Sequence, residues 1–492
     1  MEIMKKDLGV IMYKREQIEQ SIIKLIINGA VLPGEKLPSV RDLAARHKFS
    51  ITPVLEALRS LEKKEIIESL PSKGFYVRND IYRNPHLSFL QEDKAQSTFM
   101  KFEILNSKFS NYAANILDPS SHIHWPMAST ITSTYYYPVD EINYHIARIA
   151  KTQEITVNLQ QQPKDLDHLV QNIMKWMIPC GCPFSNKELS LVCSATQALM
   201  LALRSCTFPG DIVAVESPGH IGFYFLLEFL QLKALRIPSD FRTGLKVSVL
   251  KSYLEKGLRP SCLLLSANYS NPTGALMPEQ SKSELVELCR QFRLPIIEDD
   301  ILGDIHFDEV RPHPLKSFDP ENVIYISGFT KSLSPAHRIA WIAGGRFHKE
   351  IVFHKNLIGA FVPLLIQQGF SSFLSSGAGA RHLQHFRQQC FEILSKSLQV
   401  INDTFPSGTI AEMPRGGLFI WIQLPQGIDT ALLSDIAKQH DITIASGKIF
   451  SSPAGEYNNC IRVNCLAMPW NVNTLEKLSL LGKIATSLIR KN

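Results

Sequence analysis

Two basic residues stand seven positions apart in the segment SGFTKSLSPAHRIAWIAGG, which runs from Ser327 to Gly345. A lysine such as Lys331 is a nucleophile that can form a Schiff base with an aldehyde. The planar fork of Arg338 can give a phosphate two parallel hydrogen bonds. Pro335 indicates a turn between them. Together they are the residue types that a phosphorylated aldehyde requires. The alternative is a chance pair on the protein surface.

Three acidic side chains follow the apolar run Pro295–Ile297, namely Glu298, Asp299 and Asp300. Open α/β sheets bind ligands at the carboxyl ends of their strands. If the apolar run is a strand, these carboxylates lie where a ligand binds. The alternative is an acidic cluster that holds a metal ion.

Other polar residues stand at junctions between expected elements. Ala195 and Thr196 lie between an apolar strand and an apolar helix, where free backbone N–H groups favour a phosphate and the threonine adds a hydroxyl. Asn271 lies in YSNPTG, which by itself indicates only a turn. Arg462, in NCIRVN, suits two-point contact with a carboxylate; the alternative is an arginine in a surface strand.

The elements that must position these residues begin at about residue 112. Short apolar runs alternate there with amphipathic segments, which predicts a mostly parallel sheet with helices on both faces. The predicted strands are Leu189–Val192, Ile212–Val215, Cys262–Leu265, Pro295–Ile297, Val323–Ile326 and Ile339–Ala343. The last part, about residues 390–492, contains the predicted strands Leu418–Leu424 and Ile461–Asn464 among helices. It predicts a smaller α+β subdomain.

The first 80 residues have a different pattern. Apolar residues at helical spacing predict a helix near Arg15–Asn28. Ser39 and Ser50 are expected to cap two further helices, the first of which ends at His47. Ile66–Val77 then predicts a two-stranded wing with a turn at its centre. This order of elements indicates a winged helix-turn-helix. The second of the two helices joined by the turn, the one that Ser50 is expected to cap, fits the major groove of DNA.

Composition and charge narrow the class of protein. The chain has 492 residues, 45% of them hydrophobic and 20% charged, so we expect a globular protein of two or three domains. Residues 1–80 contain 14 Lys and Arg against 11 Asp and Glu, a net +3 of the total +6, which weakly indicates a polyanionic partner. The nine cysteines are scattered, which favours reduced thiols, and the start of the sequence shows no signal-peptide core. We therefore expect a cytoplasmic protein. No apolar run is uninterrupted, so we expect no membrane spans.

The expected domain boundaries follow from these patterns. Residues 1–80 form the winged helix, residues 81–111 a linker, and residues 112–492 the α/β domain with its small subdomain at about 390–492.

The segment LPSVRDLAARHKFSITPVLEALRSLEKKEIIESLPSKGFYV, Leu37 to Val77, resembles the DNA-binding domain of the GntR family. The resemblance implies that Arg41, Thr52 and Gly74 touch a double-stranded DNA operator. Ile51 and Leu55 stand where members of that family often carry arginine. The alternative is a winged helix that contacts only protein.

Residues from about 160 to 470 resemble the fold-type I aminotransferases, which use pyridoxal 5′-phosphate (PLP). The resemblance implies that Lys331 forms the Schiff base and that Arg338 binds the phosphate. It also implies that Asp299 pairs with the pyridine nitrogen and that Asn271 donates to the phenolic oxygen.

The same resemblance assigns three further places. Ala195 and Thr196 match the phosphate-binding helix start, His220 falls where a tyrosine commonly stacks on the pyridine ring, and Arg462 matches the arginine that holds a substrate α-carboxylate. Two departures stand out. Gly328 replaces a phosphate-binding serine, and Ile301 and Leu302 occupy the place of a tyrosine that bonds the phenolic oxygen.

Both parts together resemble the MocR subfamily of GntR regulators. The resemblance implies a homodimeric transcriptional regulator that binds PLP and responds to PLP or to an amino acid or amine. The retained anchors favour cofactor binding, and the departures favour a sensor over an efficient enzyme. An active aminotransferase acting on an α-amino acid stays an alternative, as does a DNA-binding protein whose large domain only dimerises. No metal site is expected.

Overall fold

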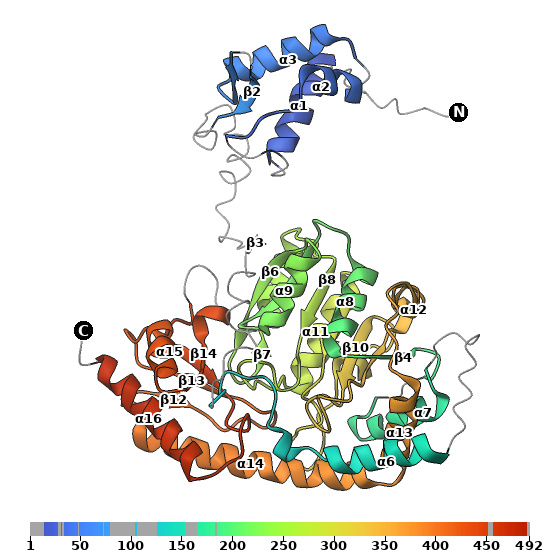
Figure 1. The fold of residues 1–492 in the computed structure, drawn as a ribbon, viewed down its shortest axis with the longest axis vertical. Coiled ribbons are helices and arrows are strands. Elements are labelled where there is room, and N and C mark those ends of the chain that lie inside the picture. Colours follow the sequence, from blue (N-terminus) through green and yellow to red (C-terminus); the bar gives the residue numbers. More distant parts are fainter. Residues whose placement is uncertain are drawn as a thin grey trace. The chain divides into compact units, whose positions relative to one another are not determined.

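The structure is a computed structural model. It describes residues 14–78 with gaps at 28–30, 32–33, 48 and 72, residues 104–105, and residues 125–489 with gaps at 153–164, 183–184 and 451–455. The chain divides into two compact units, residues 1–102 and residues 103–492 (Figure 1). Most of the predicted linker, residues 81–111, lies outside the described residues. Its described part, Ile104–Leu105, is the short strand β3.

The first unit has the predicted order of elements. It contains α1 (Lys14–Ile27), α2 (Val40–His47), α3 (Ile51–Lys63), β1 (Ile67–Leu70) and β2 (Gly74–Val77). β1 and β2 pair antiparallel as the wing. The winged helix-turn-helix is therefore confirmed as the fold of this unit.

The two predicted helix caps in this unit differ. The hydroxyl of Ser39 accepts from the Asp42 backbone N–H at 3.2 Å, and the Ser39 backbone N–H donates back to the Asp42 carboxylate at 3.3 Å. This is a reciprocal capping box. Ser50 occupies the N-cap of α3, as predicted, but its side chain makes no capping hydrogen bond. α3 is stabilised instead by burial of its apolar face, at Val54, Ala57, Leu58 and Leu61.

The second unit is built on a nine-stranded sheet with the order β3-β6-β5-β8-β9-β10-β11-β4 and with β7 paired to β6. Its strands are β4 (Leu189–Val192), β5 (Ile212–Ser217), β6 (Lys233–Asp240), β7 (Gly244–Leu245), β8 (Cys262–Leu265), β9 (Ile296–Asp299), β10 (Val323–Gly328) and β11 (Ala340–Ala343). β6, β5, β8, β9 and β10 run parallel, and β11 runs antiparallel to both of its neighbours. The predicted mostly parallel sheet is confirmed, although β6 and β7 were not predicted.

Helices cover this sheet and complete the unit (Figure 1). They are α6 (Val139–Thr152), α7 (Asp167–Met177), α8 (Ala195–Cys206), α9 (Ile221–Phe229), α10 (Val247–Glu255), α11 (Glu279–Gln291), α12 (His348–Leu357), α13 (Leu364–Ser375), α14 (Ala378–Thr404), α15 (Thr430–Lys438) and α16 (Val472–Ile489). No helix in the part of the chain that the structure describes is long and apolar enough to span a bilayer.

Alternate residues of the strands point into two different cores. Ala340 and Ile342 of β11 pack with α8, α9 and α12 on one face. Trp341 and Ala343 pack with α6, α7 and α13 on the other. Because both faces are buried, the strands are continuous apolar runs, which explains why the sequence pattern found most of them.

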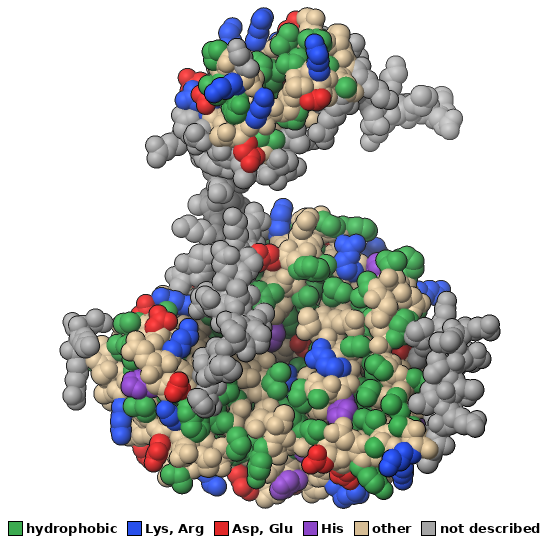
Figure 2. Space-filling view, viewed as in Figure 1, with side chains coloured by type: hydrophobic (Ala, Val, Ile, Leu, Met, Phe, Trp, Pro, Cys, Tyr) green, Lys and Arg blue, Asp and Glu red, His purple; other side chains and the backbone are tan. Residues whose placement is uncertain are grey.

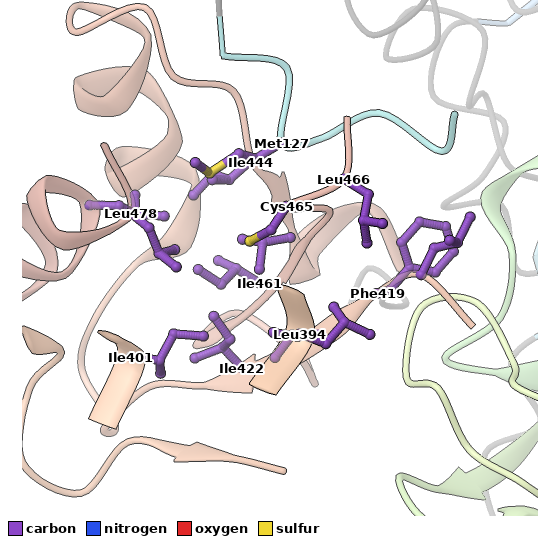
Figure 3. Close-up of a cluster of buried hydrophobic side chains, with 14 of the residues drawn as sticks. Met127, Leu394, Ile401, Phe419, Ile422, Ile444, Ile461, Cys465, Leu466 and Leu478 are labelled. Atoms are coloured by element: carbon purple, nitrogen blue, oxygen red, sulfur yellow. The ribbon is translucent and has the colours of Figure 1, made fainter. Parts of the chain in front are cut away.

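A smaller antiparallel sheet forms the last part of the chain, with the order β12-β13-β15-β14. Its strands are β12 (Ile410–Ala411), β13 (Ile420–Gln423), β14 (Ala445–Ser446) and β15 (Cys460–Val463). Its core joins residues far apart in the sequence, because one buried cluster contains Met127, Leu394 of α14, Ile461 of β15 and Leu478 of α16 (Figure 3). The segment around Met127 is thereby fixed on the small subdomain.

Candidate functional site

A cavity of about 240 Å³ lies at the carboxyl ends of the parallel strands. The predicted residues that line it are Ala195, Thr196, His220, Asn271, Asp299, Lys331 and Arg338. They come from the ends of β4, β5, β8, β9 and β10 or from the loops after them, so the sheet brings together positions up to 143 residues apart (338 − 195). This is the place where open α/β sheets bind ligands.

Of the three consecutive acidic residues, Asp299 alone lines the cavity. The Glu298 carboxylate accepts from the backbone N–H groups of Leu315 and Lys316 at 2.8 and 3.1 Å. Asp300 is held by other groups, described next. Strand alternation thus separates the three carboxylates, and the structure describes no group of three or more His, Cys, Asp or Glu arranged to hold a metal.

Asp300 belongs to a buried network behind the cavity. Its carboxylate accepts from Arg311 at 2.8 Å, from the Tyr325 hydroxyl at 2.7 Å and from the Asn268 amide at 2.9 Å. Arg311 also pairs with Asp304 at 3.1 Å. Paired charges in a dry interior fix the geometry of neighbouring backbone, and here that backbone includes Asp299.

The electrostatics of the cavity increase the neutral fraction of its amine and leave its carboxylic acid mostly ionised near neutral pH. Burial, together with the charges of Arg462 and Arg338, lowers the pKa of Lys331 to about 8, and Asp299 opposes this shift. Burial raises the pKa of Asp299 to about 6, against a hydrogen bond from the Ile301 backbone N–H. A lowered lysine pKa is a property of nucleophilic lysines.

One end of the cavity is suited to an anion. The hydroxyl of Ser194 caps α8 by accepting from the Gln197 backbone N–H at 3.1 Å, and the Gln197 side chain accepts from the Cys193 backbone N–H at 2.9 Å. This directs the start of α8, with Ala195 and Thr196, at the cavity.

Two other groups face the same cavity. Arg338 lines it with a left-handed backbone, φ +55°, a strained conformation that residues other than glycine adopt where the surrounding structure holds them. Thr330, which the sequence analysis did not single out, also lines it. Its hydroxyl is buried and has no hydrogen-bond partner among the described residues, so it can serve a bound ligand.

The structure explains why position 328 is glycine and not the serine that the aminotransferase resemblance leads us to expect. It pairs with Ala340 of the adjacent strand. A Cβ atom at this position would lie 2.7 Å from the Ala340 Cβ and 2.8 Å from its Cα. The close approach of the two strands therefore requires glycine here.

Arg462 is buried rather than in a surface strand, with 2% of its surface exposed. One guanidinium nitrogen, Nη1, donates to the Asn271 Oδ1 at 2.8 Å, and Nη2 donates to the carbonyl of Ala128. The rings of Phe419 and Phe450 lie 4.6 and 5.6 Å from its central carbon. The structure thus places Arg462 directly beside a cavity residue.

His220 lines the cavity, whereas its aromatic neighbours Phe223 and Tyr224 are buried away from it. The His220 Nδ1 accepts from the Gly222 backbone N–H at 2.8 Å, and burial, with Lys331 and Arg462, lowers its pKa to about 3. The ring is therefore neutral with its proton on Nε2.

The place of the missing tyrosine is apolar, because Ile301 and Leu302 both line the cavity. Tyr269 lines it as well, and the sequence analysis did not predict it. Its hydroxyl is buried without a hydrogen-bond partner among the described residues, and burial raises its pKa. Its backbone has φ +56°, which no sequence signal disclosed.

In the first unit, Arg41 on α2, Thr52 on α3 and Gly74 at the start of the wing are all exposed. Lys and Arg side chains are prominent on the visible face of this unit (Figure 2). Exposed cations of the unit include Lys36, Arg41, Arg59, Lys63 and Lys73. Gly74 has φ +106°, and this left-handed turn requires glycine.

Comparison with known proteins agrees with both folds. Residues 14–77 match the model of the bacterial regulatory proteins of the gntR family, and residues 135–475 match that of the class I and II aminotransferases. The second match spans more than half of the chain. The chain therefore belongs to the class I and II aminotransferase family, and it carries a gntR-family helix-turn-helix domain.

Two full-length relatives combine both parts. The chain is 29% identical to the uncharacterized HTH-type transcriptional regulator YdcR and 27% identical to YjiR, a protein of the same description, both from Escherichia coli K12. The matches cover 96% of this chain and 99% and 98% of those proteins. A solved structure, the α-aminoadipate aminotransferase LysN of Thermus thermophilus complexed with N-(5′-phosphopyridoxyl)-L-leucine, matches with TM-score 0.68 and 24% identity over 75% of this chain and 93% of that one, which shows the shared fold.

Proposed function

We propose that this chain is a DNA-binding transcriptional regulator whose aminotransferase-family unit binds PLP and responds to PLP or to an amino compound. The observation that carries the proposal is the cavity in which Lys331, Asp299, Asn271, Arg338 and the start of α8 meet. The gntR-family domain and the full-length regulators to which the chain is similar support the DNA-binding half. We further propose that the regulator acts as a cytoplasmic homodimer.

The residues present fit PLP. An amine, a carboxylate and an amide face one cavity, and Arg338 and the α8 N–H groups offer hydrogen bonds to a phosphate there. The Thr330 hydroxyl, which has no partner among the described residues, also lines the cavity and can add another. When bound, PLP supplies a reactive aldehyde and a ring that accepts electrons from an attached amino compound. Thr330 thereby compensates for the serine that Gly328 excludes.

This chain's own residues would divide the remaining work. With a pKa of about 8, Lys331 has a substantial neutral fraction near pH 7 and can attack an aldehyde. Asp299, with a pKa of about 6, is mostly ionised there and can hold a proton on a ring nitrogen. The apolar side chains of Ile301 and Leu302 exclude water from that side of the cavity and offer a ligand no hydrogen bond.

The first test is a visible absorption spectrum of the purified chain titrated with PLP, beside the variant Lys331→Ala. We expect a Schiff-base band in the wild type and none in the variant. Asn459→Ala, a change at a buried asparagine outside the cavity, is a matched control that should keep the band. A wild type without the band would refute PLP binding through Lys331.

An active aminotransferase is the second candidate, and the position of Arg462 favours it. Its guanidinium lies beside Asn271 at the cavity, where it can hold an α-carboxylate. The discriminating assay follows conversion of an amino acid and 2-oxoglutarate to the exchanged ketoacid pair. Sustained product formation supports the enzyme, and a spectral change without turnover supports the sensor.

The DNA-binding half has its own test. Fluorescence anisotropy with DNA from upstream of the chain's own gene should detect binding that weakens with salt, because phosphate contacts release counterions. Arg41→Ala should weaken it. Equal binding by the wild type and by a variant that lacks residues 1–78 would refute this half of the proposal.

A further inference from the structure

The first unit has an apolar surface at the start of α3, the helix that a winged helix-turn-helix places in the major groove of DNA. Ile51 is a large apolar residue, yet 47% of its surface is exposed. Thr52 is exposed beside it, and Leu55 is half-buried. Residues three and four apart are neighbours on a helix, so Leu55 adjoins both. The methyl groups of these three side chains form one surface, which we call the methyl patch.

The core of the unit fixes the orientation of the methyl patch. The opposite face of α3 is fully buried, at Val54, Ala57, Leu58 and Leu61. Only one rotation of the helix buries all four side chains, and that rotation turns the methyl patch away from the core. The wing is joined to the far end of the same helix, because the Glu62 carboxylate accepts from the Ser69 hydroxyl at 2.5 Å and from its backbone N–H at 3.1 Å.

The start of α3 lacks the residue types that read purines. In the major groove, Arg or Lys reads guanine and Asn or Gln reads adenine, each by two hydrogen bonds. The first two turns, Ile51–Leu58, contain none of these four residue types. Their one charged residue is Glu56, which accepts and does not donate when ionised, and so suits the amino group of cytosine. Apolar contact is therefore the main means of base recognition that this part of the helix offers.

Thymine is the base that offers an apolar group to the major groove. Its C5 methyl group projects there beside the O4 acceptor, whereas guanine, adenine and cytosine present donors and acceptors without a methyl group. The methyl patch can bury a thymine methyl group favourably. Against the other bases it covers polar edges without giving them a hydrogen bond, which costs free energy. The patch therefore discriminates in favour of thymine.

Positive charge around the methyl patch favours DNA over an apolar protein surface as its partner. Arg59 lies one turn beyond Leu55 on the same face of α3, and Arg41 lies on α2. Lys73 lies in the turn of the wing, and Lys36 forms a bridge with the wing strand β2. All four cations are exposed. A helix in the major groove has phosphates on both sides, so cations beside an uncharged reading surface match the charge of a duplex.

We propose that the methyl patch reads thymine methyl groups, so that the operator of this chain carries thymine at the bases that Ile51, Thr52 and Leu55 face. The inference rests on the proposed DNA-binding function and adds which base is recognised and by which side chains. The cations around the patch contact phosphates, which carry no sequence information directly. Affinity and base preference are therefore assigned to different residues of the same unit.

Replacement of thymine by uracil tests the inference, because it removes the methyl group and keeps every hydrogen-bonding group of the base. The full-length chain first selects its sites from a randomised double-stranded DNA library. The selected duplex is then synthesised with deoxyuridine at one thymidine position at a time, and affinity is measured by fluorescence anisotropy. We expect binding to weaken about fourfold at each contacted thymine, as the exposure of one buried methyl group predicts. Equal affinity for all of the uracil duplexes would overturn the inference.

Variants assign the effect to the methyl patch. Ile51→Gln places a good helix former at an exposed position, and the uracil penalty should vanish at the thymine that Ile51 faces. Thr52→Ser removes one methyl group, keeps the hydroxyl and makes the same test at a second position. Leu70→Gln, at a wing residue that is 39% exposed, is the matched control and should keep every penalty. The slope of log K against log salt should be equal in all four proteins, because no variant changes a charge.

The two proposals fail in different ways. If the chain enriches no DNA from the library, the DNA-binding half of the proposed function is refuted and this inference with it. If it enriches a site that binds equally well with uracil, thymine reading alone is refuted. Uracil penalties that are the same in the wild type, Ile51→Gln and Thr52→Ser would show that the methyl groups act through the shape of the DNA, and they would also overturn the role of the patch.

Discussion

The pKa of Lys331 makes a quantitative prediction about the capture of PLP. The neutral amine is the nucleophile, and it predominates above the pKa. With a pKa of about 8, roughly one Lys331 side chain in eleven is neutral at pH 7, against roughly one in 3,000 for an ordinary lysine. We therefore expect the rate of band formation to rise about tenfold per pH unit below pH 8 and to level off above it.

Two substitutions should move this profile in opposite directions, because the charges around Lys331 have opposite signs. Arg462 lowers the pKa of Lys331 and Asp299 raises it. Arg462→Gln should therefore shift the midpoint of the pH–rate profile to higher pH, and Asp299→Asn should shift it to lower pH, each by on the order of one pH unit. Both changes keep a side chain of similar size.

Stopped-flow absorbance at a fixed PLP concentration measures the midpoint separately from the amplitude, so weaker PLP binding does not distort the comparison. Asn459→Ala should keep the wild-type midpoint. A wild-type midpoint near 10, or shifts of the same sign in the two charge variants, would show that burial and these two charges do not set the reactivity of Lys331.

Three further predictions concern packing, DNA and the buried network. Gly328→Ser should destabilise the protein by about 2 kcal/mol in urea unfolding, because the Cβ collides with the facing strand, and it should not tighten PLP binding; a tighter complex would contradict the packing argument. Arg41→Ala should weaken operator binding and reduce the slope of log K against log salt by about 1, whereas Arg15→Ala, on α1, should leave that slope unchanged. Asp300→Ala should cost about 3 kcal/mol of unfolding free energy because it leaves the Arg311 guanidinium buried with one partner fewer; a loss below about 1 kcal/mol would show that the network is dispensable.

The sequence was sufficient to predict those strands and caps whose burial or bonding involves only residues close together in the chain. β4 and β8 were predicted to the residue, because strands covered on both faces are unbroken apolar runs between breakers. β6 was missed because its run KALRIPSD contains a lysine, an arginine and a proline, and its place in the sheet depends on pairing with β5. The cap of α2 was predictable from Ser39 and Asp42, since the bonding groups lie three residues apart.

Residue types and the order of the motifs also identified the candidate site residues, because an amine, a carboxylate and a guanidinium can be recognised in the sequence itself. Tertiary structure alone decided which of them meet. The packing of β9 between β8 and β10 directed Asp299, and not its two acidic neighbours, to the cavity, and the approach of two strands excluded a side chain at Gly328. The tertiary structure also brought Thr330 to the cavity and the Ala128 carbonyl to Arg462. Contacts between residues hundreds of positions apart depend on how whole elements pack, and no local pattern in the sequence records them.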